Sequence, residues 1–164
     1  MQVAAGKLVA LERVSAQYSE ASAPKSLRIL LAEDNLINQK LVAKLLEHKG
    51  YHVTAVVNGR EALAELDRQK FDLVLMDIQM PVMDGYECAA EIRKREQQTG
   101  GRMPIIALTA HCTGEKDPCR PASGVDEYVF KPLRPKQLFD AIAASIEPSP
   151  DLSPVPRDLV SQVQ

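Results

Sequence analysis

Five polar side chains directly follow apolar stretches of the chain and could together form one reactive site. Glu33 and Asp34 follow the first stretch, Asp77 follows a later one, and Thr109 and Lys131 end two more. Carboxylates, a hydroxyl and an ammonium suit the capture of a tetrahedral anion such as a phosphoryl group. A single carboxylate at such a place is more often a helix cap or a solvated charge, so the hypothesis requires that the five residues meet.

Three carboxylates in one crevice repel and raise one another's pKa unless a cation lies between them. A hard divalent ion with oxygen ligands suits Glu33, Asp34 and Asp77, and Mg²⁺ is the natural choice. A carboxylate at such a site can attack phosphorus and form an acyl phosphate. The residues therefore predict phosphoryl transfer, in which the protein mainly positions groups and neutralises charge.

The element that must hold Asp77 is the continuous apolar run 73–76, which is typical of a strand buried on both faces of a parallel sheet. Pro81, Asp84 and Gly85 then predict a turn. In open parallel sheets, ligands bind beyond the carboxyl ends of the strands, and Asp77 is the first residue there.

The same unit, a strand and then a helix, recurs along the chain. We expect strands over residues 27–32, 52–57, 73–77, 104–108 and 126–130. We expect helices after the caps Asn35 and Asn58 (the first stopped by Gly50), over about 85–97, and over about 135–146, with a short or irregular helix between 111 and 125. The pattern predicts an α/β fold, a doubly wound five-stranded parallel sheet of (βα)5 order with right-handed crossovers.

Apolar spacing predicts which helix faces are buried. The expected contacts are Ile37, Leu41, Val42, Leu45 and Leu46 in the first helix, Ala62, Leu63 and Leu66 in the second, Tyr86, Ala89, Ala90 and Ile92 in the third, and Leu138, Ile142 and Ile146 in the last. His48 and His52 have no partner pattern and are expected at the surface.

One domain is expected over residues 27–146. Residues 1–26 indicate a linker or N-terminal extension, with a short amphipathic helix as the alternative, and residues 147–164 indicate a disordered tail rich in Pro and Ser.

Composition excludes several classes of protein. The net charge is −2 and the sequence has no basic stripe that could bind a nucleic-acid backbone. Aromatic residues are scarce and Trp is absent, which disfavours the stacking of bases on the protein. The apolar runs are too short to span a bilayer, and no secretory signal is visible, so we expect no membrane contact by this segment. The three cysteines lack metal-like spacing and fit free thiols in a reducing cytoplasm.

Four separated motifs resemble the receiver domain of two-component response regulators. They are Leu31–Asn35, Met76–Gly85, Ala107–His111 and Tyr128–Pro132, in the family's order and spacing. Asn35 after the acids, and Met83–Gly85, most resemble receivers of hybrid sensor histidine kinases. The resemblance covers about residues 27–146 and implies the CheY-like, flavodoxin-like fold with strand order 2-1-3-4-5.

The resemblance also implies roles for single residues. Asp77 would be the phospho-acceptor, and Glu33, Asp34, Asp77 and the backbone carbonyl of Gln79 would hold Mg²⁺. Thr109 and Lys131 would bind the phosphoryl oxygens, and a cis peptide between Lys131 and Pro132 would aim the ammonium into the site. Tyr128 would be the aromatic that follows Thr109 in the switch, or else an edge-strand packing residue. Gln79 and His111 would tune hydrolysis, although His111 fits a simple loop residue equally well.

The implied function is a phosphorelay receiver that takes a phosphoryl group from a phosphohistidine and changes conformation. Its partners would be a histidine kinase or a histidine phosphotransfer protein, and the family allows a weak dimer. The domain would promote its own phosphotransfer and dephosphorylation, and it could be part of a hybrid kinase. The segment Asp117–Pro121 departs from the family, because it interrupts the fourth helix and so weakens the expectation of the usual signalling face.

Other readings stay open at this point. A stand-alone response regulator and a phosphorylation-independent interaction module use the same fold. A dehalogenase-like phosphatase would need a second Asp where Gln79 stands. A flavodoxin-like electron carrier would need a phosphate loop where Glu33 and Asp34 stand, and these acids would repel a phosphate.

Overall fold

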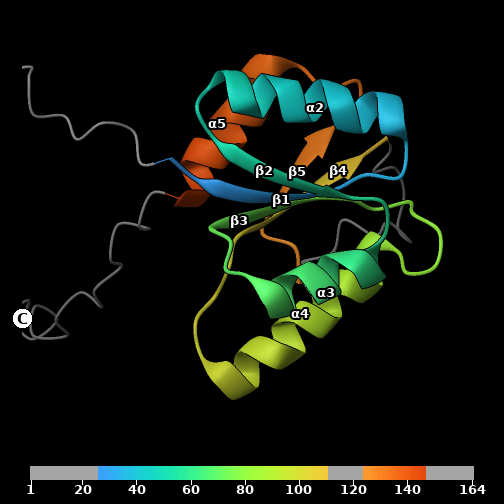
Figure 1. Ribbon diagram of the computed structural model, residues 1–164, viewed down its shortest axis with the longest axis vertical. Helices are drawn as coiled ribbons and strands as arrows, with labels where there is room; N and C mark the ends of the chain where they lie inside the picture. The colour runs from blue at the N-terminus through green and yellow to red at the C-terminus, as the bar shows by residue number, and fades with distance from the viewer. Residues whose placement is uncertain (1–25, 111–123, 147–164) are drawn as a thin grey trace, which may run out of the picture.

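Five parallel strands form a single sheet in the order β2-β1-β3-β4-β5 in the computed structural model, which describes residues 26–110 and 124–146 (Figure 1). The strands are β1 (Arg28–Ala32), β2 (His52–Val56), β3 (Leu73–Asp77), β4 (Ile105–Thr109) and β5 (Glu127–Phe130). The predicted strand order is confirmed, and each observed strand begins or ends within a residue or so of the predicted one.

The register of the sheet aligns the carboxyl ends of its strands. Ala32 of β1 pairs with Val56 of β2 and with Met76 of β3. Asp77 pairs with Leu108, and Thr109 pairs with Phe130. Residues at or just beyond these positions therefore lie along one edge of the sheet.

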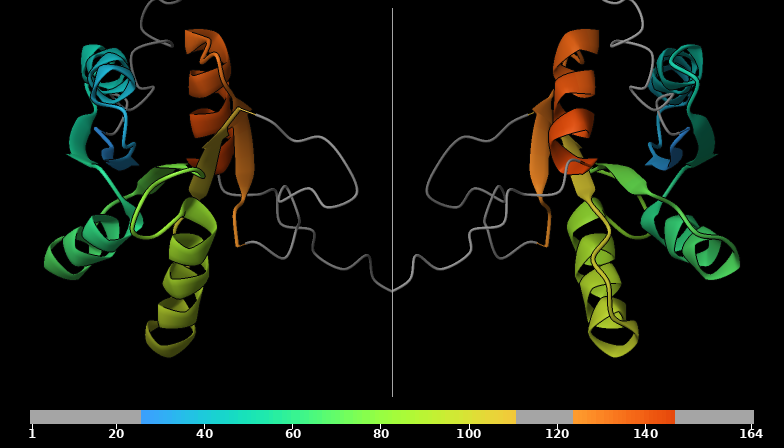
Figure 2. Two further views of the ribbon diagram at one scale, coloured as in Figure 1. Left: turned by 90° about the vertical axis from the view of Figure 1, so that its right-hand side faces the viewer. Right: turned by 90° about the vertical axis from the view of Figure 1, so that its left-hand side faces the viewer.

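Four described helices cover the two faces of the sheet. They are α2 (Leu36–His48), α3 (Gly59–Arg68), α4 (Gly85–Thr99) and α5 (Pro135–Ile146). Two views at right angles show α2 and α5 on one face and α3 and α4 on the other (Figures 1 and 2). The irregular helix expected between 111 and 125 falls almost wholly on residues 111–123, outside the described residues.

The core has one layer on each side of the sheet because neighbouring strand residues point to opposite faces. Leu30, Ala32, Val74 and Met76 face α3 and α4. Ile29, Leu31, Leu73 and Leu75 face α2 and α5. All five residues of β3 are buried, as predicted for a strand in the middle of a parallel sheet.

The predicted caps start the helices. The side chain of Asn35 accepts hydrogen bonds from the backbone N–H groups of Ile37 and Asn38, and Asn58 accepts one from Glu61. After α2, Gly50 takes a φ of 85°, which suits glycine, and so ends the helix as expected. Among the described helices, none has the length and apolarity that a membrane span requires.

The predicted apolar stripe of α2 is partly wrong. Val42 and Leu46, four residues apart, are buried against the sheet, whereas Ile37 is 78% exposed and Leu41 is 57% exposed. Successive helix positions are rotated by about 100°, so the row through Ile37 and Leu41 lies beside the buried row rather than on it. The first turns of α2 therefore show apolar side chains to solvent.

Two smaller expectations about helix faces are also wrong. Ala90 is exposed and Cys88 is buried in its place, because the face of α4 that starts at Gly85 continues through Cys88, Ala89 and Ile92. In α5, Leu138 and Ile142 are buried as predicted. Ile146 is 38% exposed because the helix ends there.

Both ends of the folded unit lie near the amino-terminal ends of the strands, opposite the carboxyl ends. The strands are parallel, so β1 begins at that end, and α5 runs back across the sheet to finish there (Figure 1). The opposite edge is left to the loops that follow the strands.

Candidate active site

A pocket of about 270 Å³ at the carboxyl edge of the sheet brings the predicted site residues together. Its lining includes all of Glu33, Asp34, Asp77, Gln79, Thr109 and Lys131. These residues come from four loops and strand ends that are up to 98 positions apart in the chain. The requirement set by the sequence, that the acids, the hydroxyl and the ammonium meet, is fulfilled.

Asp77 is held from two sides at the end of β3. One carboxylate oxygen, Oδ1, accepts a hydrogen bond from the backbone N–H of Gln79 at 3.1 Å. The other, Oδ2, accepts one from Nζ of Lys131 at 3.0 Å. The side chain is 8% exposed, so the carboxylate is aimed into the pocket while the protein covers most of its surface.

Glu33 is fully buried beneath the pocket. Its Oε2 accepts a hydrogen bond from Nζ of Lys131 at 2.9 Å, and its Oε1 accepts one from the backbone N–H of Asn35 at 3.2 Å. Burial raises the pKa of the Glu33 carboxyl, and the negative charge of Asp77 adds to this, although the bond to Lys131 opposes it. The site therefore disfavours the charge on Glu33 when no further cation is present.

Lys131 joins the two deepest acids through a single ammonium. Burial alone would lower the pKa of Lys131, but the hydrogen bonds and charges of Glu33 and Asp77 outweigh it and raise the pKa. The backbone N–H of Lys131 donates to the Thr109 carbonyl at 2.7 Å, which ties β5 to the end of β4. The peptide bond from Lys131 to Pro132 is cis, as the family resemblance implied.

The three carboxylates form a group that could hold a metal ion. Glu33, Asp34 and Asp77 each offer one oxygen, and these oxygens all lie within 4.8 Å of one another. Asp34 is exposed whereas the other two are buried, so the group opens to solvent on its Asp34 side. Hard oxygen donors of this kind fit Mg²⁺.

The remaining predicted residues have different placements. Thr109 is the last residue of β4 and is buried at the pocket wall. Tyr128 lies in β5, where it is half-buried and packs against the core layer on the α3 and α4 side. This position agrees with edge-strand packing, and the switch role of Tyr128 stays a prediction. His111 lies outside the described residues.

Three residues that line the pocket lie outside the predicted site set. Asn38 and Ala110 were missed by sequence reasoning, and Asn35 was predicted only as a helix cap. Asn38 lies three residues after the cap Asn35, so the helical repeat places both on the side of α2 that meets the pocket. That spacing was a usable signal for Asn38, whereas Ala110 carries no chemical group that would draw attention.

The loop from β3 to α4 packs tightly under Asp77. The backbone N–H of Gly85 donates to the Ile78 carbonyl at 2.9 Å. A Cβ on Gly85 would overlap the Asp77 carbonyl oxygen and approach Cα of Ile78 to 2.9 Å. Within the same loop, Val82 has a φ of 72° and is 70% exposed, an uncommon conformation for a β-branched residue.

The chain is similar to known proteins. Residues 29–143 match the response regulator receiver domain family. The chain is 43% identical over 125 residues to "Hybrid signal transduction histidine kinase I" of Dictyostelium discoideum, a match that covers 73% of this chain and 7% of that protein. It is 38% identical over 136 residues to "Sensor histidine kinase GacS" of Pseudomonas protegens, covering 82% of this chain and 15% of the relative.

Solved structures agree with the fold. The receiver domain of sensor histidine kinase PA1611 from Pseudomonas aeruginosa, solved with a magnesium ion in its active site cleft, is 37% identical, with a TM-score of 0.66 over 74% of this chain and 98% of that one. The chemotaxis response regulator CheY4 of Vibrio cholerae is 30% identical, with a TM-score of 0.65 over 73% of this chain and 98% of that one. The chain thus spans a whole receiver but only a small part of the curated kinases it matches.

Proposed function

Because this chain belongs to the response regulator receiver domain family, we propose that it takes up a phosphoryl group on Asp77 within a phosphorelay. The observation that carries the proposal is the contact of Asp77 with Lys131 at 3.0 Å inside a pocket that also holds Thr109, Glu33 and Asp34. The proposed donor is a phosphohistidine, as the similarity to hybrid histidine kinases suggests.

The transfer exchanges one bond to phosphorus for another. A carboxylate oxygen of Asp77 attacks phosphorus, the P–N bond to the donor imidazole breaks, and the imidazole nitrogen keeps the electron pair. Lys131 already lies at hydrogen-bond distance from Asp77, so its ammonium can follow the negative charge onto the phosphoryl oxygens. Thr109 supplies a hydroxyl donor at the same wall.

Glu33, Asp34 and Asp77 are the side chains proposed to hold Mg²⁺, with the backbone carbonyl of Gln79 as a further ligand. The chemistry of the donors fits, because their oxygens lie within 4.8 Å of one another. When bound, Mg²⁺ would offset the repulsion between the phosphoryl oxygens and the carboxylates. The protein's own part is to hold the three carboxylates close together in spite of their repulsion.

The exposed apolar residues of α2 are proposed to contact the protein that carries the phosphohistidine. Leu36, Ile37 and Leu41 are each more than half exposed, and they belong to the same turns of α2 as Asn35 and Asn38, which line the pocket. Because the Asp77 side chain is only 8% exposed, the donor imidazole must enter the pocket, and its carrier must then cover the neighbouring surface. A histidine kinase or a histidine phosphotransfer protein is the proposed partner.

Intact-mass analysis after incubation with acetyl phosphate and Mg²⁺ tests this function. The unmodified chain should gain one phosphoryl group, and both Asp77→Asn and removal of Mg²⁺ should abolish the gain. Asp67→Asn is the matched control, since that side chain is 68% exposed and pairs with Arg95 away from the pocket. Phosphorylation that persists in Asp77→Asn, or that is lost equally in Asp67→Asn, would contradict the assignment of Asp77.

A further inference from the structure

Gln39 connects the loop that carries Glu33 and Asp34 to the end of β2. Its Nε2 donates a hydrogen bond to the backbone carbonyl of Glu33 at 3.1 Å and another to the backbone carbonyl of Val56 at 2.9 Å. A side-chain amide nitrogen carries two N–H groups, and both are used here. The side chain is partly buried, so water competes little for these bonds.

The connection lies just beyond the point where the sheet itself holds the chain. The ladder between β1 and β2 ends at the pair Ala32–Val56. One further backbone bond follows, from the Glu33 N–H to the Val56 carbonyl at 3.0 Å. Gln39 then fixes the Glu33 carbonyl, and thus the peptide unit that joins the two acids of the loop.

The carboxylates of this loop are repelled by each other and by Asp77. The oxygens of Glu33, Asp34 and Asp77 lie within 4.8 Å of one another, and Lys131 donates to Glu33 and Asp77. Glu33 and Asp34 lie in a loop, whereas Asp77 is still part of β3. Repulsion among the three carboxylates therefore favours movement of the loop away from Asp77. A fixed backbone between Glu33 and Asp34 opposes that movement.

We propose that Gln39 is a positioning residue for the cation site, which keeps the carboxylates of Glu33 and Asp34 in place before the ion binds. The inference rests on the proposed function, because it assumes that this site takes Mg²⁺. Gln39 reaches the backbone of the loop, whereas its neighbour Asn38 lines the pocket, so Gln39 acts through the two acids and not by touching the ion. Outer partners of this kind commonly change metal affinity by 10-fold or more when they are replaced.

Calorimetric titration of the full chain with Mg²⁺ tests the proposal. Gln39→Met keeps the approximate size of the side chain and removes both donors, and it should weaken Mg²⁺ binding about 10-fold. Gln97→Met is the matched control, because Gln97 lies on the exposed surface of α4 and should bind Mg²⁺ as the unmodified chain does. Thermal unfolding without metal shows at which temperature every variant is folded, and the titrations are made below it.

Gln39→Leu provides a second, independent variant. It removes both donors without adding a charge near the cation site, so the carbonyl oxygens of Glu33 and Val56 lose their partner. Both hydrogen bonds are then lost, so Mg²⁺ binding should again weaken by about 10-fold or more.

The possible outcomes separate the inference from the function beneath it. Weakened Mg²⁺ binding in both Gln39 variants, with Gln97→Met unchanged, would support the positioning role. A folded Gln39→Met that has a lower unfolding temperature but the Mg²⁺ affinity of the unmodified chain would overturn it, and Gln39 would then be structural only. An unmodified chain that binds no Mg²⁺ would overturn both the inference and the proposed metal site.

Discussion

At the scale of single residues, one ammonium serves two buried acids. Lys131 contacts Glu33 at 2.9 Å and Asp77 at 3.0 Å, so one positive charge is shared between two negative ones. The site therefore carries an excess of negative charge, to which the exposed Asp34 adds. Burial is the main cause that raises the pKa of Glu33, and the charge of Asp77 adds to it, in spite of the bond to Lys131.

A dependence of stability on pH follows from Glu33. Because its pKa is raised in the folded chain, its contribution to stability is fully present below the ordinary value of 4.5 and is lost as pH rises through the raised value. The glutamine in Glu33→Gln cannot ionise, so this variant does not lose that contribution. In the absence of Mg²⁺, the unfolding temperature of Glu33→Gln minus that of the unmodified chain should increase as pH rises from about 4.5 towards about 7. Thermal unfolding followed by circular dichroism over this range measures the difference.

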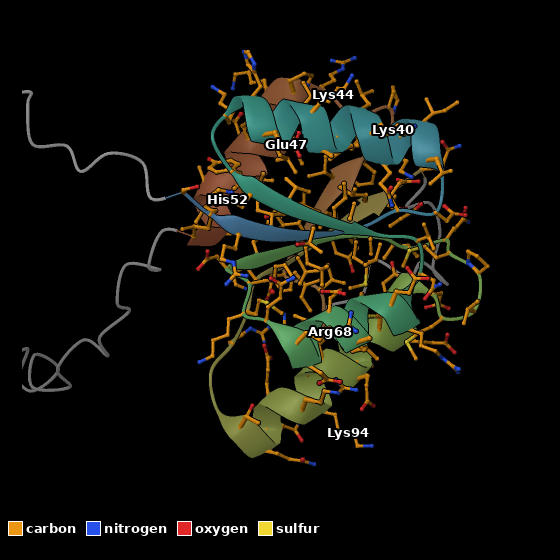
Figure 3. All side chains as sticks on the ribbon, in the orientation of Figure 1. Lys40, Lys44, Glu47, His52, Arg68 and Lys94 are labelled. Atoms are coloured by element: carbon orange, nitrogen blue, oxygen red, sulfur yellow. The ribbon has the colours of Figure 1, made fainter. Side chains whose placement is uncertain are left out.

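Glu47→Gln controls for the removal of any carboxylate, since Glu47 lies on the exposed part of α2 (Figure 3). A difference between Glu33→Gln and the unmodified chain that stays constant across the pH range would contradict the raised pKa. Added Mg²⁺ should reduce the difference at the upper end, because the ion would favour the ionised carboxylate.

At the scale of elements, the first residue of α4 packs closely against the end of β3, which carries Asp77. Gly85 begins α4 and packs against the backbone of Asp77 and Ile78, so no side chain fits there. We expect Gly85→Ala to destabilise the fold by about 2 kcal/mol, because the overlap is with backbone that cannot turn aside. Phosphorylation by acetyl phosphate should also slow, since α4 can relax only by displacing the end of β3.

Gly50→Ala is the comparison for Gly85→Ala. Gly50 has a φ of 85° but open space around its Cα, so alanine there meets backbone strain without a clash and should cost about 1 kcal/mol. Chemical denaturation gives both free energies of unfolding. If Gly85→Ala keeps the stability and the phosphorylation rate of the unmodified chain, the close packing at Asp77 is not required.

The sequence predicted the elements better than their orientations. Strands and caps depend on local features, such as the apolar run before Asp77 and the side chain of Asn35, and these were confirmed. The buried side of α2 was predicted less well. Only part of its apolar residues are buried against the sheet, and the sequence pattern does not indicate that Ile37 is exposed to solvent. The hydrogen bonds of Gln39 could not be predicted either, since they reach the loop after β1 and the end of β2, which meet only in the fold.

At the scale of the whole molecule, the exposed surface of α2 changes in character along the length of the helix. The charged residues Lys40 and Lys44 lie on its outer side (Figure 3). Its first turns, beside the pocket, show Leu36 and Ile37 to solvent instead. Exposed apolar side chains that lie together are typical of a surface that meets another protein.

Ile37→Ser tests this surface. The substitution should leave the free energy of unfolding within about 0.5 kcal/mol, because Ile37 is 78% exposed, and it should leave phosphorylation by acetyl phosphate unchanged. Transfer from a phosphorylated histidine kinase or phosphotransfer protein should slow about tenfold, which corresponds to about 1.4 kcal/mol. Transfer kinetics followed with radiolabelled phosphate measure the effect.

Ile146→Ser is the matched control, since Ile146 is also exposed and apolar but ends α5 at the far edge of the sheet. Equal rates of protein-to-protein transfer for the two variants would argue against a docking role for α2. Slowing with acetyl phosphate in Ile37→Ser would instead indicate a disturbed pocket.

The chain enters the folded unit at Leu27, which is already buried in the core, and leaves it at Ile146, both at the end of the sheet remote from the pocket (Figure 1). A phosphohistidine domain tethered at either point must reach around the sheet, a path of at least the strand length, about 16 Å for five residues. The effective concentration of such a donor is therefore close to zero for a connection too short to span that path, and it passes through a maximum as the connection lengthens. Linker length would thus decide whether Asp77 receives its phosphoryl group from a donor in the same chain or from another molecule.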